Sequence, residues 1–477
     1  MNGLVLTVLM TAATPDTERL ALRAAVHIHT TFSDGSHSVE EIAKRAGQEG
    51  IDVVVLGDHF LTRVEYGPPL LRKALAVSVR LSSLSPQDLD LYSEAARKAE
   101  RQTGVLVLPG VEIAPFYYWT GNPLSGRLTL NSAHRHLLVV FPERPDLVGL
   151  ARALTEMSAP GIQDFRTGSL LLAWPFLPAL WAVNRLRRSR RSLLAWFVAA
   201  ASVAALVRSW PYPVPRFSPY AGDAGAAPYQ EAVNMARSTS SLTFWAHPET
   251  SVESRHPRYP VVDRSDKYPE LISGTRGATG FASLYEGYRQ AAAPAGPWDQ
   301  ALQEFVRGER PWPVWTLGEL DLHEQGEAGG KHLSEVETVV LAKERSRGAV
   351  IEALATGSMY AVRQPGTSRL TLERFQAVCS GHEVGMGERA AVMGPCRIEA
   401  VLRSGGVSLP EVAVTLIRNG EVVSERRVDI AEEGVKLEWD EDGPSHESLF
   451  FRLVARRGNR LALYGNPIFV DGEEGAP

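Results

Sequence analysis

The chain has 477 residues, of which 44% are hydrophobic and 22% are charged, a composition that excludes an intrinsically disordered protein. This length exceeds what one ordinary hydrophobic core supports, so we expect two domains. The formal net charge of −5 provides no basic footprint, so duplex nucleic acid is not an expected partner.

The first segment in chain order, residues 1–21, has the features of a signal or leader. Residues 1–13 (MNGLVLTVLMTAA) combine a short apolar run with small residues, as a secretory signal does, but no Lys or Arg precedes the run. A frayed leader or a wrongly assigned start is the alternative interpretation, and the residues favour neither one.

Residues 22–365 alternate short β-branched runs with amphipathic helical stretches, which predicts repeated βα units. A capping box, SVEE at 38–41, begins a helix, DVVVLG at 52–57 is a buried strand, and Ser85-Pro86 begins a second helix. Further strands are predicted at VLVLPGVEI, HLLVVF, LTFWAH, TGFASLYEG and PVWTLGELDLH. We therefore expect an α/β fold built on a barrel of parallel strands.

Two charge-free runs of 16 residues, 168–183 and 192–207, flank NRLRRSRR at 184–191 and make an apolar hairpin of 166–210. Each run would be roughly 24 Å long as a helix, against about 30 Å of membrane hydrocarbon. Four tryptophans and the arginines fit an interfacial belt and a cytoplasmic turn. The alternative, a buried hairpin, would have to place five arginines in its turn. We therefore expect membrane association through 168–207 with an extracytoplasmic catalytic domain; a cytoplasmic location is the alternative.

After residue 365 the pattern changes to short alternating segments, which predicts a small antiparallel β-sandwich over residues 366–477. Asn419-Gly420, between VTLIR and EVVSERR, predicts a hairpin turn. The two cysteines, Cys379 and Cys396, also lie here. Two buried free thiols are the simpler expectation, because a disulfide requires an oxidising compartment.

Histidines and carboxylates recur at the ends of the predicted strands. His27 and His29 are two residues apart on one strand, so both side chains should leave the same face, and Asp321 and His323 repeat the spacing. In a parallel barrel such strand ends meet on one rim. A single histidine of this kind would be structural, but the whole set predicts a centre for more than one metal ion. Its other members are Asp34, His59, Glu112, His136 and His247.

The segment VHIHTTFSDG at 26–35 resembles the opening signature of the PHP (polymerase and histidinol phosphatase) domain family. Five further segments resemble the later motifs of this family in the same order. They are GDH at 57–59, GVEI at 110–113, the His before LLVV, AHP at 246–248 and DxH at 321–323. The resemblance covers residues 22–365 and implies a distorted (β/α)7 TIM-like barrel with two or three divalent metals. Two features depart from it: the inserted apolar hairpin, and GELDLH, where many relatives have a serine before the aspartate.

The resemblance also implies a ligand set for each metal. His27, His29, Glu112 and Asp321 would hold the first, Glu112, His136 and His247 the second, and Asp34, His59 and His323 the third. Zn, Mn or Fe suits such ligation.

Metals that share a bridging carboxylate lower the pKa of a water that can attack phosphorus. The implied activity is therefore that of a metal-dependent phosphoesterase, a hydrolase acting on a phosphorylated small molecule or a short nucleotide. Glu112, Asp321 and Asp58 would have catalytic roles, Asp58 by orienting a ligand or carrying protons. Arg255 and Arg258 are candidates for substrate binding, because guanidinium binds phosphate bidentately. The alternative is a membrane-tethered binding or regulatory module without turnover, which the complete ligand set disfavours.

Overall fold

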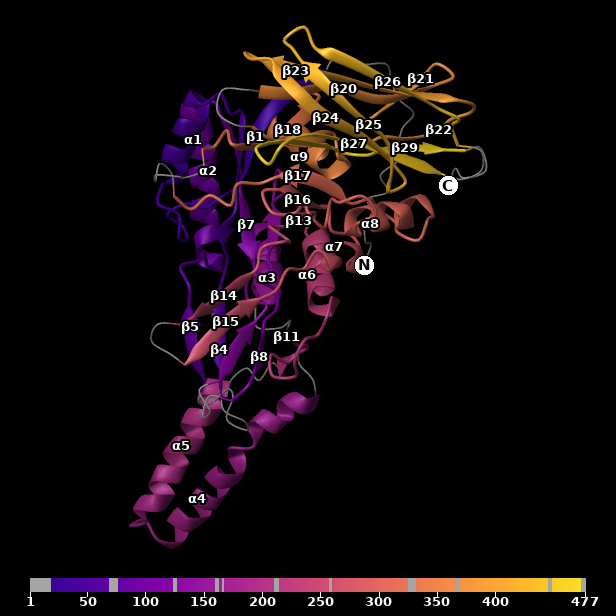
Figure 1. Cartoon of the computed structure of the whole chain (residues 1–477). Coiled ribbons are helices and arrows are strands. Elements are labelled where there is room, and N and C mark those ends of the chain that lie inside the picture. The colour runs from indigo at the N-terminus through magenta and orange to yellow at the C-terminus, as the bar shows by residue number, and fades with distance from the viewer. Residues whose placement is uncertain are drawn as a thin grey trace.

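A computed structural model describes residues 19–67, 76–122, 127–158, 163–164, 167–209, 214–256, 260–324, 332–364, 369–444 and 448–472 (Figure 1). The fold is mixed α/β. Most of the predicted leader lies outside the described residues, and β1 begins at Leu20, inside the segment 1–21. The helices are α1 Val39–Gln48, α2 Leu89–Thr103, α3 Leu147–Ser158, α4 Phe176–Arg188, α5 Leu193–Ser209, α6 Ala227–Ser238, α7 Glu270–Gly274, α8 Pro297–Val306 and α9 Arg347–Thr356.

Several local predictions are confirmed. Ser38 caps α1 by accepting a hydrogen bond from the backbone of Glu41, whose side chain accepts one from the Ser38 backbone, so the capping box is complete. The segment DVVVLG contains β2, Val53–Leu56, and a short 3-10 turn at Pro86–Asp88 leads into α2. These features were predictable because each depends on neighbours in the sequence.

Two large sheets carry most of the candidate site. The six-stranded sheet has the order β17 (Trp315–Gly318), β16 (Gly280–Leu284), β13 (Leu242–Trp245), β10 (Leu137–Val140), β7 (Gly110–Ile113) and β3 (Asp58–His59). The eleven-stranded sheet joins β6 (Leu106–Leu108), β2, β1 (Leu20–Ile28), β18 (Val336–Ala342), β19 (Met359–Arg363), β28 (Leu461–Gly465), β27 (Leu449–Arg457), β29 (Ile468–Asp471) and β22 (Arg389–Ala391), while β24 (Leu409–Arg418) pairs with β27 and carries β25 (Glu421–Ile430).

The strand directions correct the expected barrel of parallel strands. β10 is antiparallel to both β7 and β13, and β1 is antiparallel to β18, whereas β1–β2 and β13–β16 are parallel. The described strands therefore form mixed sheets. Alternation of apolar residues predicts where a strand lies but carries no information about its direction, which is why the sequence did not reveal this.

The smaller sheets complete the architecture. One contains β14 (Val252–Arg255), β15 (Val261–Ser265), β9 (Leu128–Asn131) and β8 (Tyr118–Thr120). Two sheets of two strands each pair β4 (Arg63–Tyr66) with β5 (Val77–Arg80) and β11 (Gln163–Asp164) with β12 (Val214–Pro215). Another contains β21 (His382–Gly385), β20 (Arg369–Cys379), β23 (Cys396–Gly405) and β26 (Val435–Glu441).

The C-terminal strands do not form the clearly separate sandwich that we expected. β28 pairs with β19, so the eleven-stranded sheet continues across the predicted boundary at residue 365. The predicted hairpin at Asn419-Gly420 is confirmed, since it joins β24 to β25 with both residues at positive φ, the conformation that this dipeptide tolerates.

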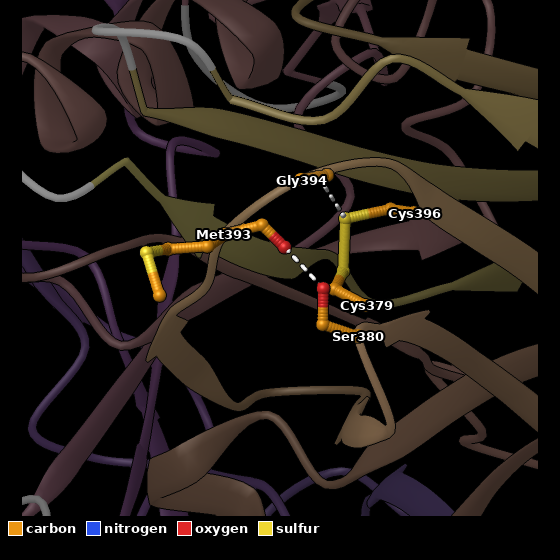
Figure 2. The surroundings of a disulfide bond; sticks show 5 residues. All are labelled: Cys379, Ser380, Met393, Gly394 and Cys396. Carbon is orange, nitrogen blue, oxygen red and sulfur yellow. Dashed lines mark hydrogen bonds between the residues drawn. A yellow bond between two sulfur atoms is a disulfide. The ribbon is translucent and has the colours of Figure 1, made fainter.

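Cys379 and Cys396 form a disulfide, so the expectation of free thiols is wrong (Figure 2). The two residues are directly opposite each other on β20 and β23, and both are buried. Next to them, the Ser380 hydroxyl donates a hydrogen bond to the carbonyl oxygen of Met393. Register between distant strands, which decides whether two cysteines meet, is not visible in the sequence.

We expect the free energy of unfolding of the double variant Cys379→Ala/Cys396→Ala to be about 3 kcal/mol lower than that of the oxidised wild type. The reason is that the disulfide joins two residues 17 positions apart and so restricts the unfolded chain. Urea unfolding followed by circular dichroism measures this difference. Reductant should destabilise the wild type by a similar amount and leave the double variant unchanged. Equal stability of oxidised and reduced wild type would contradict the prediction.

The apolar hairpin contains α4 and α5, which project from the rest of the molecule (Figure 1). The first charge-free run is not one helix: a 3-10 segment, Thr167–Ala173, precedes α4, and α4 has three arginines in its last turn. No helix among the described residues is long and apolar enough to cross a membrane. The predicted insertion through 168–207, with the membrane partner and the membrane-associated location inferred from it, is therefore wrong.

Candidate metal centre

The side chains of His27 and His29 lie close together because of a β-bulge, which the alternation of residues along a strand does not predict. The pairing of β1 with β2 shifts register between Val26 and Ile28, and His27 lies in this bulge at φ 67°, while His29 follows the strand. The bulge re-aims His27, so the Nε2 atoms of the two buried histidines are 3.2 Å apart.

Three residues of the predicted set have left-handed backbone: His27 at φ 67°, His247 at φ 30° and Asp321 at φ 49°. This conformation is uncommon for residues other than glycine and tends to occur at functional sites. Backbone hydrogen bonds hold it in place, since Leu322 N donates to His27 O at 3.1 Å and His29 N donates to Leu322 O at 2.9 Å. The segment containing Asp321 is thereby fixed against the end of β1.

Glu112, on β7, lies at the centre of the histidines and is almost completely buried. Its Oε1 atom is 2.7 Å from His136 Nδ1, 3.0 Å from His247 Nε2 and 3.3 Å from His27 Nε2. Its Oε2 atom is 2.9 Å from His59 Nδ1 and 3.7 Å from His29 Nε2. One carboxylate therefore contacts five imidazoles that come from different strands and loops.

The histidines and carboxylates form three groups of candidate ligands. In each group every residue offers one nitrogen or oxygen atom, and these atoms are all within 4.8 Å of one another. His29 and Glu112 each belong to two groups, so the three form one continuous cluster. Asp321 completes the neighbourhood of the first two histidines, with Oδ1 3.4 Å from His29 Nε2 and 3.8 Å from His27 Nε2. The groups are His27, His29 and Glu112; Glu112, His136 and His247; and His29, Asp34, His59 and His323.

Asp34 is held in place by a loop that Asp58 supports. The Asp58 carboxylate accepts hydrogen bonds from Thr30 N at 2.7 Å, from Thr30 Oγ1 at 2.9 Å and from Ser33 Oγ at 2.6 Å. Asp34 then approaches His29 Nδ1 at 3.2 Å and His323 Nε2 at 3.5 Å. Because both oxygens of Asp58 are engaged in this way, its contacts favour an orienting role over proton transfer.

The mutual charges of the cluster shift its pKa values strongly. Burial would raise the pKa of Glu112, but nearby histidines, His136 and His27 first, hold it well below its usual range. Burial would lower the pKa of His29, yet hydrogen bonds to Asp321 and Asp34 raise it to about 9. Burial dominates at His136, whose pKa falls to about 4. Burial would lower the pKa of His27 as well, but contacts with carboxylates, Glu112 first, raise it well above its usual value. A divalent cation bound here would therefore compete with protons at His27 and His29.

The donor set fits divalent cations. Imidazole nitrogens and carboxylate oxygens are ligands that suit Zn, Mn and Fe. His136 Nδ1 is buried and lacks a hydrogen bond, although Glu112 Oε1 is only 2.7 Å away. The ligand atoms of Glu112, His136 and His247 all lie within 4.8 Å of one another, a spacing that suits three ligands of one cation.

Glu319 is a functional candidate that the sequence reasoning missed. Its buried carboxylate lies 2.8 Å from His27 Nδ1 and accepts a second hydrogen bond from the backbone of His247. A carboxylate at Nδ1 fixes the proton there and leaves His27 Nε2 free to face the cluster. The signal was present in GELDLH, where an acidic residue stands in the motif that departs from the PHP pattern.

We expect Glu319→Gln to weaken metal binding by roughly 10- to 100-fold, because an amide offers one acceptor where two N–H donors converge. Competition with a chromogenic chelator measures the affinity. Glu324→Gln, an exposed neighbour outside the groups, is the matched control and should bind metal as the wild type does. Wild-type affinity in Glu319→Gln would exclude the positioning role.

Not every predicted residue reaches the cluster. Arg255 is exposed at the end of β14, in a different sheet, and belongs to none of the three groups. Arg258 lies outside the described residues.

No protein-family model and no curated protein matches the sequence. Among solved structures, a two-domain protein from Bacteroides vulgatus with a predicted PHP-like metal-dependent phosphoesterase is similar at 13% identity and TM-score 0.35, covering 92% of both chains. A proposed metal-dependent phosphoesterase from Bifidobacterium adolescentis has 17% identity and TM-score 0.27, covering 66% of this chain and 92% of its own. An amidohydrolase from Chromobacterium violaceum has 18% identity and TM-score 0.29, covering 65% of this chain and 90% of its own. Likeness at this level assigns no residue and no activity to the chain.

Proposed function

We propose that the chain is a metal-dependent hydrolase of the PHP barrel type that cleaves phosphate esters. The observation that carries the proposal is Glu112, a single buried carboxylate in contact with five histidines and shared by two of the ligand groups. Shared carboxylates of this kind characterise sites for two or more cations. Such cations, when bound, supply Lewis acidity and a nucleophilic water at neutral pH.

The residues of the chain have distinct roles in this proposal. His27, His29, Glu112 and Asp321 would hold one cation, and Glu112 with His136 and His247 a second. Asp34, His59 and His323 would hold a third. Because the cluster is preorganised by Glu319, by Asp58 and by the left-handed backbone at three ligands, little rearrangement is required when a substrate binds.

The concentration of positive charge favours phosphate esters as the substrate class. Two or three divalent cations side by side match the charge of a phosphate and of its developing transition state. A neutral amide or ester carries no such charge in the ground state. The natural substrate would be a phosphorylated small molecule or a short nucleotide.

The test is to load the purified protein with Mn, measure bound metal by mass spectrometry, and assay a panel of aryl phosphate mono- and diesters and aryl amides. We expect phosphate ester hydrolysis that His29→Ala abolishes and Glu324→Gln retains. Turnover of aryl amides but of no phosphate ester would contradict the proposed phosphoesterase activity and would indicate an amide hydrolase. Bound metal without turnover on any panel would favour a binding or regulatory module.

A further inference from the structure

Three arginines from separate parts of the chain gather around one tyrosine near the candidate metal centre. The Cζ atoms of Arg289, Arg363 and Arg456 lie 5.4, 5.7 and 5.3 Å from the centre of the Tyr288 ring. Arg289 follows the end of β16, Arg363 ends β19, and Arg456 is on β27. We call these four residues the Tyr288 cluster.

The loop that carries Tyr288 is hydrogen-bonded to the segments that carry His247 and Asp321. Leu284 O accepts a hydrogen bond from the backbone of Glu319, the residue that holds His27. The buried carboxylate of Glu249, two residues beyond His247, accepts backbone hydrogen bonds from Arg289 at 3.1 Å and from residues 290 and 291. The cluster therefore has a fixed position beside the metal centre.

Tyr285 connects the two regions. Arg363 donates a hydrogen bond from Nη2 to the carbonyl oxygen of Tyr285 at 2.9 Å, and its Cζ is 6.0 Å from the Tyr285 ring. Burial, followed by the negative charges of Glu286 and Asp321, raises the pKa of Tyr285. Asp321 belongs to the candidate metal centre, so Tyr285 lies within the electrostatic reach of both regions.

Among the described residues, no carboxylate forms an ion pair with the arginines of the cluster, although the charges of Glu286 and Glu249 act on Arg289 from a greater distance. Within the described ranges, no carboxylate oxygen lies within 4.0 Å of the guanidinium nitrogens of Arg289, Arg363 or Arg456. The buried Nε of Arg363 also has no hydrogen-bond partner. A buried N–H group without an acceptor is costly, so such groups usually face a water or a ligand. Guanidinium groups bind phosphate and carboxylate bidentately.

We propose that the Tyr288 cluster is an anion subsite that binds a second negatively charged group, phosphate or carboxylate, of the substrate. The inference rests on the proposed function, because it places the scissile phosphate at the metal centre and the second anion at the arginines. The substrate class is thereby narrowed to phosphate esters that carry an additional anionic group.

Binding of non-hydrolysable probes tests this subsite independently of turnover. The Mn-loaded full chain is titrated calorimetrically with alkylphosphonates, with α,ω-alkylene bisphosphonates of increasing length, and with the matching ω-carboxyalkylphosphonates. We expect at least one bisphosphonate or carboxyalkylphosphonate to bind about tenfold more tightly than the alkylphosphonate of the same length. One added charge-assisted hydrogen bond accounts for a gain in affinity of this size. The two dianionic series distinguish phosphate from carboxylate as the second group.

Variants assign any advantage to the cluster. Arg363→Gln and Arg456→Gln should each reduce the advantage of the dianionic probe by at least about threefold and leave alkylphosphonate binding unchanged. Arg457→Gln is the matched control, since it removes the same charge from the opposite face of β27. Thermal melting verifies that each variant is folded.

The outcomes separate the two proposals. Equal affinity for mono- and dianionic probes at every length, or an advantage that survives in both cluster variants, would overturn the subsite. Failure of the proposed phosphoesterase would appear instead as absence of turnover of all phosphate esters, with the probe preference intact.

Discussion

Glu112→Gln is expected to lose at least two of the bound cations and to reduce hydrolysis by more than ~100-fold, a larger loss than removal of an outer supporting residue produces. The amide has nearly the same shape as the carboxylate but lacks its charge. Glu112 contacts five imidazoles and contributes to two ligand groups, so its neutralisation removes the negative charge around which the histidines gather. Metal content by mass spectrometry and initial rates with aryl phosphate measure the two effects.

The sign of the charge effect can be checked separately in the metal-free protein. There the negative charge of Glu112 is the second-largest influence on the pKa of His27, after burial, and it acts to raise that pKa. In Glu112→Gln the pKa of His27 should therefore fall, which NMR titration of labelled histidines detects. Glu324→Gln, which changes an exposed carboxylate outside the cluster, should match the wild type in metal content, rate and titration. Full metal content in Glu112→Gln would show that the carboxylate is not a shared ligand.

Arg452→Ala is expected to reduce the free energy of unfolding by about 3–5 kcal/mol, because it leaves a buried carboxylate without its counter-charge. Arg452 on β27 and Asp299 on α8 are both completely buried and are joined bidentately, at 2.6 Å from Nε and 2.7 Å from Nη2. The guanidinium also lies 4.7 Å from the Trp298 ring. This contact joins the C-terminal strand β27 to helix α8.

The control for this prediction is the double variant Arg452→Met/Asp299→Leu, which replaces both charges by apolar groups of similar size. Such replacements are often neutral or stabilising, so the double variant should be markedly more stable than Arg452→Ala. Denaturant unfolding of the three proteins measures the differences. A loss below 1 kcal/mol in Arg452→Ala would contradict the prediction.

Features that depend on local sequence could be predicted. The capping box at Ser38, the strand at 53–56 and the turn at Asn419-Gly420 each follow from neighbouring residues, and all are present in the structure. The histidines and carboxylates at predicted strand ends were identifiable for the same reason, since a strand end is marked locally by its residues. Their role as metal ligands remains a prediction.

Errors arose where a prediction needed strand direction, register or helix continuity. The antiparallel β10, the pairing of β28 with β19 and the bond between Cys379 and Cys396 all depend on which distant segments meet. The charge-free run 168–183 was counted as one helix, whereas the structure has a 3-10 segment before α4.

Local residue patterns were enough to show which residue types are available for the site and at which predicted strand ends they lie. The folded chain was needed to show that Glu112 belongs to two ligand groups, that a bulge orients His27, and that Glu319 contacts His27. The physical reason is that a side chain's neighbours depend on the register and direction of strands far apart in the chain. Those are fixed by burial and pairing across the whole molecule, and local residue patterns do not encode them.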